Sequence, residues 1–273
     1  MTPQAVIPAC FRQESSLRII ERERIYMSVL ILAYHRINDW SSDTLVIPPE
    51  RFRRQINFLK RRYQIVSLKD IIAAQKAGLA QKERLAAITF DDGYFDNYRY
   101  AYPILEESGC TATFFLTVSY IGTENLPQPL FSKEGSPPLK KGEEGGFKDR
   151  LLNWSEVAEM AKDGFTFGSH SLTHINLTAV PPSVAREEIT KSRQILEEKT
   201  GRGVGFFCYP FGRHSPEIRQ MVAEAGYQAA LFTPAFISCF SFRKSLEPDL
   251  YSLKRVGIYH HTNLWQFRLK VGA

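Results

Sequence analysis

The sequence predicts an α/β protein in which seven or eight parallel strands close into a (β/α) barrel. Short apolar stretches that suit buried strands alternate with amphipathic stretches that suit helices through most of the chain. Such alternation is typical of parallel strands connected by helices, and this number of strands favours a barrel. The length of 273 residues and the hydrophobic content of 44% fit one domain of this kind.

The first strand is expected at about 28–34, where the apolar residues are continuous. A helix is expected over 50–62, because Phe52, Ile56 and Leu59 recur at helical spacing among Arg and Lys residues. One face of this helix should therefore pack on the sheet while the other meets water.

The next elements surround a central strand. A short strand over 64–66 leads into a helix that starts at Leu68 and is stopped by Gly78. The stretch over 85–90 is apolar throughout, which predicts a strand buried on both faces. A helix over 96–108 follows, interrupted early by a proline.

The middle of the chain contains a strand, an insertion and a second strand with its helix. The segment 111–118 is rich in residues that favour β-structure. Residues 123–150 are rich in Pro, Gly and charge, which predicts a flexible low-complexity insertion, with a lid over the active site as the alternative. A helix over 153–164 and an alternating strand over 165–169 come next.

The last third continues the alternation. A long helix over 181–200 begins at a Pro pair and ends at a glycine. It precedes a strand over 204–209, a helix over 216–225 and a strand over 227–233. A final strand is expected over 253–259, which would complete the sheet.

Residues 1–26 have Arg and Glu where a secretory signal would have an apolar segment, so no such signal is expected there. Because the first long apolar run closely follows Met27, Met27 is a candidate for the native start, with residues 1–26 as an extension ahead of a single domain over 27–273. No apolar stretch is long enough for a membrane span, and a cytoplasmic protein is expected.

The net charge of +6 is scattered and no nucleic-acid motif accompanies it, which argues against a nucleic-acid partner. The four cysteines form no CxxC pair, which argues against a disulfide framework or thiolate zinc site.

Two carboxylates end the central strand. Asp91 and Asp92 follow the apolar run directly, and Gly93 allows the chain to turn. Acids at the end of a buried parallel strand lie where α/β enzymes place their chemistry. If the backbone stays extended, the two side chains point to opposite sides and can perform different tasks in one site.

Two histidines with metal-ligand spacing follow a later strand. His170 and His174 lie four residues apart, so a helical turn there would place both rings on one face. Ser171 stands where the HExxH zinc motif has its glutamate, so the base must come from the acid pair. Two imidazoles and one carboxylate leave a coordination position open for water on a divalent metal, most readily zinc.

These residues resemble the polysaccharide deacetylases, the NodB-homology group also called carbohydrate esterase family 4. Its first two motifs are similar to Thr89-Phe90-Asp91-Asp92-Gly93 and His170-Ser171-Leu172-Thr173-His174, and the resemblance extends from about Leu30 to Tyr259. It includes Tyr34-His35, Trp154 and the segment Phe206-Phe207-Cys208-Tyr209-Pro210-Phe211-Gly212. The resemblance implies a distorted (β/α) barrel and metal-dependent hydrolysis of an N-acetylated glycan.

Matched residue by residue, the resemblance gives each side chain a role. Asp91 would be the general base, and Asp92, His170 and His174 would be the metal ligands. The backbone N–H of Phe211 would stabilise the oxyanion of the tetrahedral intermediate.

The later motifs depart from the family pattern. Cys208 stands where many members have the arginine that orients the base, and Arg255 is the candidate to replace it. The last motif is approximated only by a segment with His260 and His261, and one of these would be the general acid.

Three further residues are candidate substrate contacts. Tyr209 and Phe211 could offer rings to a sugar, and His35 could line the pocket, although aromatic residues at strand ends are commonly core. The predicted reaction is release of acetate from an amino-sugar polysaccharide or oligosaccharide. Hydrolysis of another C–N bond, in a cyclic imide or ureide, and a catalytically silent glycan-binding protein are the alternatives.

Overall fold

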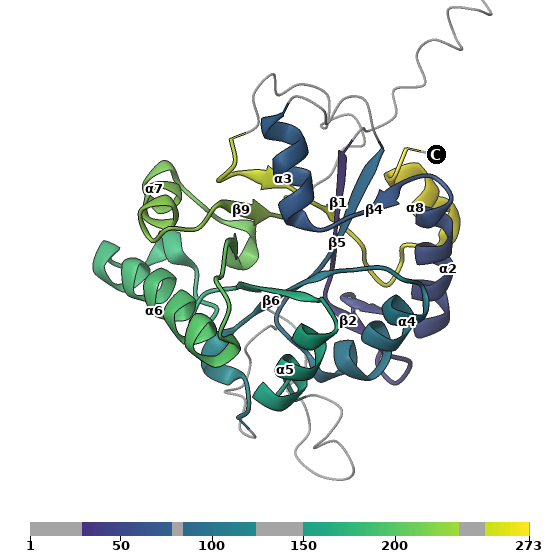
Figure 1. Cartoon of the computed structure of the whole chain (residues 1–273), viewed down its shortest axis with the longest axis horizontal. Coiled ribbons are helices and arrows are strands. Elements are labelled where there is room, and N and C mark those ends of the chain that lie inside the picture. Colours follow the sequence, from purple (N-terminus) through teal and green to yellow (C-terminus); the bar gives the residue numbers. More distant parts are fainter. Residues whose placement is uncertain (1–28, 78–83, 124–149, 235–248, 273) are drawn as a thin grey trace, which may run out of the picture.

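The computed structural model describes residues 29–77, 84–123, 150–234 and 249–272, and shows a parallel sheet surrounded by helices (Figure 1). The sheet strands are β1 (Val29–Tyr34), β4 (Gln64–Ile65), β5 (Leu85–Phe90), β6 (Thr113–Leu116), β7 (Thr166–Ser169), β8 (Phe206–Cys208), β9 (Ala229–Phe232), β10 (Leu253–Lys254) and β11 (Val256–Gly257). The helices are α2 (Pro49–Lys60), α3 (Leu68–Lys76), α4 (Tyr102–Glu107), α5 (Trp154–Lys162), α6 (Pro182–Thr200), α7 (Pro216–Glu224) and α8 (Leu264–Lys270). Two short strands, β2 (Arg36–Ile37) and β3 (Val46–Ile47), pair with each other.

The strand order is β11-β1-β5-β6-β7-β8-β9-β10, with β4 beside β5, and every pairing is parallel. Both ends of this path come from one stretch of chain, because β10 pairs with β9 and β11 pairs with β1. The sheet is therefore a nearly closed barrel, and the predicted barrel of seven or eight parallel strands is confirmed.

The strand expected over 253–259 is two short strands. Its two halves bond to different neighbours, with Leu253 opposite Leu231 and Val256 opposite Leu32. Arg255 lies between the halves, and its N–H donates to the carbonyl of Phe232. The stretch thus crosses from one edge of the sheet to the other, and it delivers Arg255 to the site where the barrel closes.

Strand β5 is held on both sides. Strand β1 pairs along its whole length, from Val29 opposite Leu85 to Tyr34 opposite Phe90. On the other side, β4 pairs with its beginning and β6 with its end. Every residue of β5 is buried, as expected for a central parallel strand.

Alternate residues of the strands pack into two apolar clusters. The larger cluster joins the outer face of the sheet to the surrounding helices, and it includes Ile88 and Phe90. The smaller cluster joins strands from around the ring with α3, and it includes Ala87 and Phe115. The strand residues divide between the two clusters because successive side chains of a strand point to opposite faces of the sheet. Burial on both faces makes the strand ends rigid supports for side chains.

The helix expected over 96–108 has two parts. A π-helical turn covers Asn97–Ala101 and α4 follows it, with Pro103 in the first turn of α4. The helical backbone is continuous across this junction, because Ala101 is helical and the N–H of Tyr102 donates to the carbonyl of Asn97. The change of helix type thus falls where the proline has no N–H to donate. The strand expected over 111–118 is shorter than predicted.

Two predicted segments, the extension over 1–26 and nearly all of the insertion over 123–150, lie outside the described residues. Among the helices that the structure describes, none combines the length and apolar character needed to cross a bilayer.

Candidate metal centre and active site

The acid pair lies at the end of β5, where the backbone changes conformation. The N–H of Asp91 donates to the carbonyl of Tyr34 at 3.0 Å, which continues the ladder with β1. Asp92 then has a φ of 72° and Gly93 a φ of 81°. The expectation of an extended backbone through both acids is therefore wrong: a left-handed turn separates the two carboxylates. Such a conformation is unfavourable for aspartate and is typical of functional sites.

The histidine pair lies on a loop that follows β7. The N–H of His170 donates to the carbonyl of Leu116 at 2.9 Å, which fixes the start of the loop against β6. Ser171 and His174 have φ angles of 66° and 60°. The expected helical turn is thus wrong, and left-handed residues bring the two rings to a centroid distance of 4.7 Å instead.

Hydrogen bonds hold this loop in its unusual conformation. Glu188, buried on α6, accepts from the N–H groups of Leu172 and Thr173 at 2.9 and 2.8 Å, and from the Thr173 hydroxyl at 2.5 Å. The Ser171 hydroxyl accepts from the His174 N–H at 2.9 Å. Glu188 is not among the residues predicted from the sequence, although an acid on the inner face of a predicted helix is a signal for such a role.

Asp92, His170 and His174 converge. Their potential ligand atoms all lie within 4.8 Å of one another, and the three side chains are buried. Oδ1 of Asp92 lies 3.5 Å from Nε2 of each histidine. Nδ1 of His170 lies 2.8 Å from the carbonyl of Cys208, so this nitrogen carries the proton and Nε2 presents a lone pair toward Asp92.

The electrostatics of these three residues fit a divalent cation. Burial lowers the pKa of His170, and burial together with His170 lowers that of His174 well below its usual value, so both rings are neutral near pH 7. Burial and the adjacent Asp91 raise the pKa of Asp92 well above its usual value. No hydrogen-bond donor within the described chain reaches Oδ1 of Asp92. A buried carboxylate oxygen that faces the Nε2 atoms of two neutral imidazoles is a set of ligand atoms that a bound cation would satisfy.

Asp91 has a different partner. The Arg255 guanidinium donates to Oδ1 at 2.7 Å and to Oδ2 at 2.6 Å, and also to the Thr89 hydroxyl at 3.0 Å. Burial favours the neutral carboxyl, but the charge and hydrogen bonds of Arg255, together with the nearby His170 and His35, outweigh this effect and hold the pKa of Asp91 well below its usual range. Arg255 is the residue expected to replace the arginine that is missing at position 208. The structure places it in bidentate contact with Asp91.

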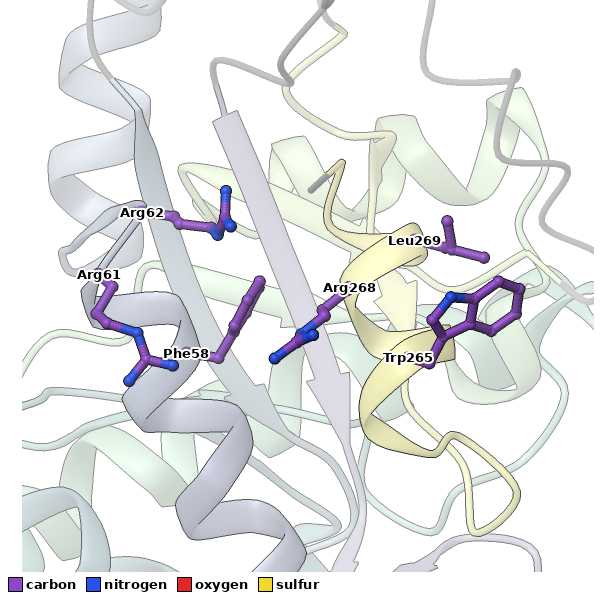
Figure 2. A pocket seen from close by; sticks show the side chains of 6 residues that line it. All are labelled: Phe58, Arg61, Arg62, Trp265, Arg268 and Leu269. Atoms are coloured by element: carbon purple, nitrogen blue, oxygen red, sulfur yellow. The ribbon is translucent and has the colours of Figure 1, made fainter.

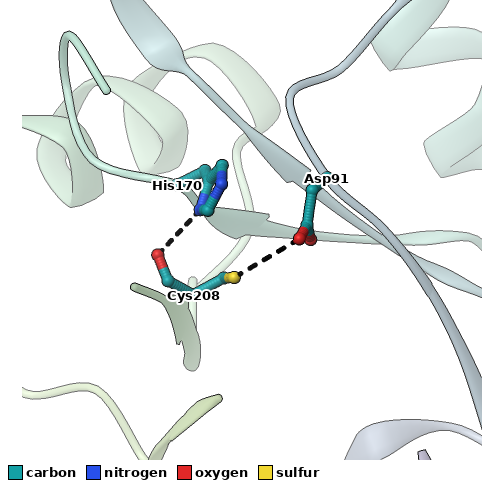
Figure 3. Close-up of side chains that lie close together, drawn as sticks. All are labelled: Asp91, His170 and Cys208. Carbon is teal, nitrogen blue, oxygen red and sulfur yellow. Dashed lines mark hydrogen bonds between the residues drawn. The ribbon is translucent and has the colours of Figure 1, made fainter. Parts of the chain in front are cut away.

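Cys208 completes a second group of possible ligands, with Asp91 and His170 (Figure 3). Its Sγ lies 3.7 Å from Oδ2 of Asp91 and 2.9 Å from Nη2 of Arg255. Burial raises the pKa of the thiol well above its usual value. Because the Arg255 cation already neutralises Asp91, this group is a poorer cation site than the one around Asp92.

His35 is the histidine nearest to the Asp91 carboxylate among the described ion pairs. Its Nε2 lies 3.8 Å from Oδ2 of Asp91, and its side chain is 16% exposed. Burial lowers the pKa of His35 to about 4, although the charge of Asp91 acts in the opposite direction.

The two aromatic candidates have different surroundings. Phe211 is 58% exposed, and its ring lies 4.7 Å from that of His174. Its φ of 58° turns the chain outward at the end of β8. Tyr209 is 1% exposed and its hydroxyl donates to the Tyr251 carbonyl, so the expected sugar contact is not available to it. As an aromatic residue at a strand end, Tyr209 belongs to the core.

The two histidines after β11 lie elsewhere. Nδ1 of His260 lies 3.1 Å from the carbonyl of Val46 on β3, and His261 stacks on Tyr259 at 5.9 Å. In the part of the chain that the structure describes, the hydrogen bonds and ion pairs of Asp91 involve neither ring. The barrel therefore brings His35, rather than His260 or His261, next to this carboxylate.

Comparisons with known proteins identify the family of this chain. The sequence model of the family named polysaccharide deacetylase matches residues 78–230, which include Asp91, Asp92, His170 and His174. Over 229 residues the chain is 27% identical to YxkH of Bacillus subtilis, which is named after this family; the match covers 84% of this chain and 70% of that protein.

A second relative has a named substrate. Over 224 residues the chain is 25% identical to the poly-β-1,6-N-acetyl-D-glucosamine N-deacetylase of Staphylococcus aureus strain MRSA252, covering 73% of this chain and 70% of that protein. Among solved structures, the Streptococcus pyogenes deacetylase PplD in complex with acetate superposes with a TM-score of 0.71 at 22% identity, covering 89% of this chain and 97% of PplD. This likeness establishes the barrel type. The chain belongs to the polysaccharide deacetylase family.

Proposed function

We propose that this protein hydrolyses N-acetyl groups of an amino-sugar polysaccharide or oligosaccharide and releases acetate. The observation that carries the proposal is that the two carboxylates at the end of β5 have different partners. Asp92 faces two neutral imidazoles, whereas both carboxylate oxygens of Asp91 accept hydrogen bonds from the Arg255 guanidinium. One carboxylate is thus available to a metal, and the other is available as a base.

A divalent cation bound by Asp92, His170 and His174, for which we propose zinc, would polarise the amide carbonyl and activate water. The chain supplies the remaining steps. Asp91 stays ionised because Arg255 stabilises its charge, so it can accept a proton from the attacking water. Arg255 also fixes the carboxylate plane, which orients the accepting oxygen.

The leaving amine needs a proton when the C–N bond breaks, and we propose that His35 delivers it. Oδ2 of Asp91 lies 3.8 Å from Nε2 of His35. Burial lowers the pKa of His35 to about 4, so its imidazole is neutral near pH 7 and can accept the proton that Asp91 takes from water. The proton removed from water thus moves to Asp91, then to His35 and finally to the amine nitrogen, and the water oxygen remains in acetate.

Phe211 is the proposed contact for the sugar. Its exposed ring lies beside His174, so a sugar ring stacked on it would hold its N-acetyl group near the three ligands. The left-handed backbone at Phe211 also supports the proposal that its N–H stabilises the oxyanion.

Acetate release tests the proposal. The wild-type protein with zinc should release acetate from N-acetylated β-1,6-linked glucosamine oligomers or from chitin oligomers, whereas dihydrouracil, a cyclic ureide, tests the alternative reaction. Asp91→Asn, which preserves the shape of the carboxylate, is the matched control and should be inactive. Turnover of dihydrouracil alone would replace the proposal, and no turnover of either class would favour a silent glycan-binding protein.

A further inference from the structure

A second candidate site lies between the C-terminal end of α2 and helix α8, which pack against each other (Figure 2). A hollow of about 490 Å³, hereafter the basic hollow, is lined by Phe58, Arg61, Arg62, Trp265, Arg268 and Leu269. Its volume lies in the range of small-ligand sites. Phe58 is buried and contacts Phe267 at 6.2 Å, which joins the two helices beneath the hollow.

Three cations gather around one ring. The guanidinium carbons of Arg62, Arg268 and Arg61 lie 4.8, 5.2 and 5.8 Å from the ring centroid of Phe58. Each contact is favourable, but the three like charges repel one another. Throughout the described ranges, none of the three side chains forms an ion pair or a hydrogen bond. A multivalent anion in the hollow would relieve this repulsion.

The other wall of the hollow is apolar and open. Trp265 is 66% exposed and Leu269 is 47% exposed, and they lie one helical turn apart on α8. Figure 2 shows both side chains extending outward on one side of α8, while Arg268 extends from the other side toward Phe58. Exposed large apolar groups beside a cationic cluster suit a ligand that has a charged end and an apolar or ring-shaped body.

The basic hollow is separate from the metal centre. Arg62 precedes β4, and Gln64 of β4 pairs with Leu85, the first residue of β5. Asp91 follows the opposite end of β5, and a strand of six residues spans roughly 20 Å. A ligand in the basic hollow would therefore not meet the acid pair.

We infer that the basic hollow binds a phosphate group that carries an apolar or ring-shaped substituent. The guanidinium forks match phosphate oxygens in geometry and charge, and arginine binds phosphate in paired hydrogen bonds. Trp265 and Leu269 then cover the substituent. Two sources share this chemistry, a free organic phosphate and the headgroup of a phospholipid.

Calorimetric titration of the zinc-loaded full chain tests the inference, with phenyl phosphate and inorganic phosphate as probes. Wild type should bind phenyl phosphate about tenfold more tightly than inorganic phosphate. The double variant Arg62→Gln/Arg268→Gln should weaken binding of phenyl phosphate at least about tenfold, because it removes two charge-assisted contacts. Trp265→Ala should remove the preference for phenyl phosphate, because the phenyl ring of the ligand would then have no aromatic side chain to pack against. Arg54→Gln, an exposed position on α2 outside the hollow, is the matched control and should bind like wild type.

Sedimentation with vesicles identifies the source. Binding to phosphatidylglycerol vesicles that is lost in Arg62→Gln/Arg268→Gln, with no binding to phosphatidylcholine, would support a phospholipid. Binding of phenyl phosphate without vesicle binding would support a free organic phosphate. Acetate release should be equal in all these variants, which separates a folding defect from loss of the site. The inference is overturned if the double variant binds both probes and vesicles like wild type, or if wild type binds none of them.

Discussion

Arg255 binds both carboxylate oxygens of Asp91, at 2.7 and 2.6 Å, although 164 positions separate the two residues in sequence. The contact is made inside the barrel, and both side chains are almost fully buried. Arg255 arrives there because its segment links the last strand of the sheet to the first. The proposed base and the group proposed to orient it are thereby joined through the closure of the fold.

Arg255→Gln should destabilise the protein strongly, because the variant leaves the Asp91 charge buried without a partner. We expect the free energy of unfolding to fall by about 3–5 kcal/mol. The double variant Asp91→Asn/Arg255→Gln removes both charges and should lose less than the sum of the two single variants. Urea unfolding of the four proteins measures the coupling. Additive losses would show that the buried pair is not coupled.

Glu188→Gln should weaken the metal site without touching a ligand. The amide oxygen can still accept from the N–H groups of Leu172 and Thr173, but without the negative charge these hydrogen bonds weaken, and the amide NH2 cannot accept from the Thr173 hydroxyl. The loop that carries both histidines would therefore be held less firmly. We expect zinc affinity to fall by about 10–100-fold. Glu187→Gln is the control, since Glu187 is exposed and pairs with Lys191 at the surface. Equal zinc affinity in the two variants would exclude an anchoring role.

His35 should contribute a pH dependence to stability. Its pKa is about 4 in the folded protein and 6.5 when unperturbed, so the unfolded chain takes up the proton first as the pH falls. Folding stability is therefore lost between pH 6.5 and 4, by about 2 kcal/mol at pH 5. In His35→Asn this contribution is absent. The free energy of unfolding of the variant, minus that of wild type, should therefore increase from pH 7 to pH 5. A constant difference would contradict the buried, neutral state of His35.

The histidines also differ in their expected effect on turnover. His35→Asn should lower kcat by about 10²-fold or more, because the leaving amine loses its proton source. His260→Asn and His261→Asn should stay within a few-fold of wild type, since neither ring contacts Asp91 in the described structure. Acetate release at saturating substrate measures all three. A large loss in either of the later variants, with His35→Asn active, would assign the general acid to that histidine.

Much of the fold follows from local patterns in the sequence. The apolar run 85–90 predicts a buried strand, and the structure has β5 with those bounds. The strand over 253–259 shows the limit of such reasoning. Its division at Arg255 depends on two neighbours on opposite edges of the sheet, which no local pattern encodes.

The candidate site was predictable in residue type more than in geometry. The spacing of Asp91, Asp92, His170 and His174 indicates a metal site, but left-handed turns rather than an extended strand and a helix bring the ligands together. Such turns depend on tertiary partners such as Glu188, which sequence spacing does not reveal.

Zinc binding to metal-depleted protein is the most direct test of the central claim, that Asp92 serves the metal and Asp91 serves the proton. Calorimetric titration should show that wild type and Asp91→Asn bind zinc with similar affinity, whereas Asp92→Asn loses binding by at least about 100-fold. Acetate release should be present in wild type alone. Binding of zinc by Asp92→Asn as tightly as by wild type, or full activity in Asp91→Asn, would contradict the account.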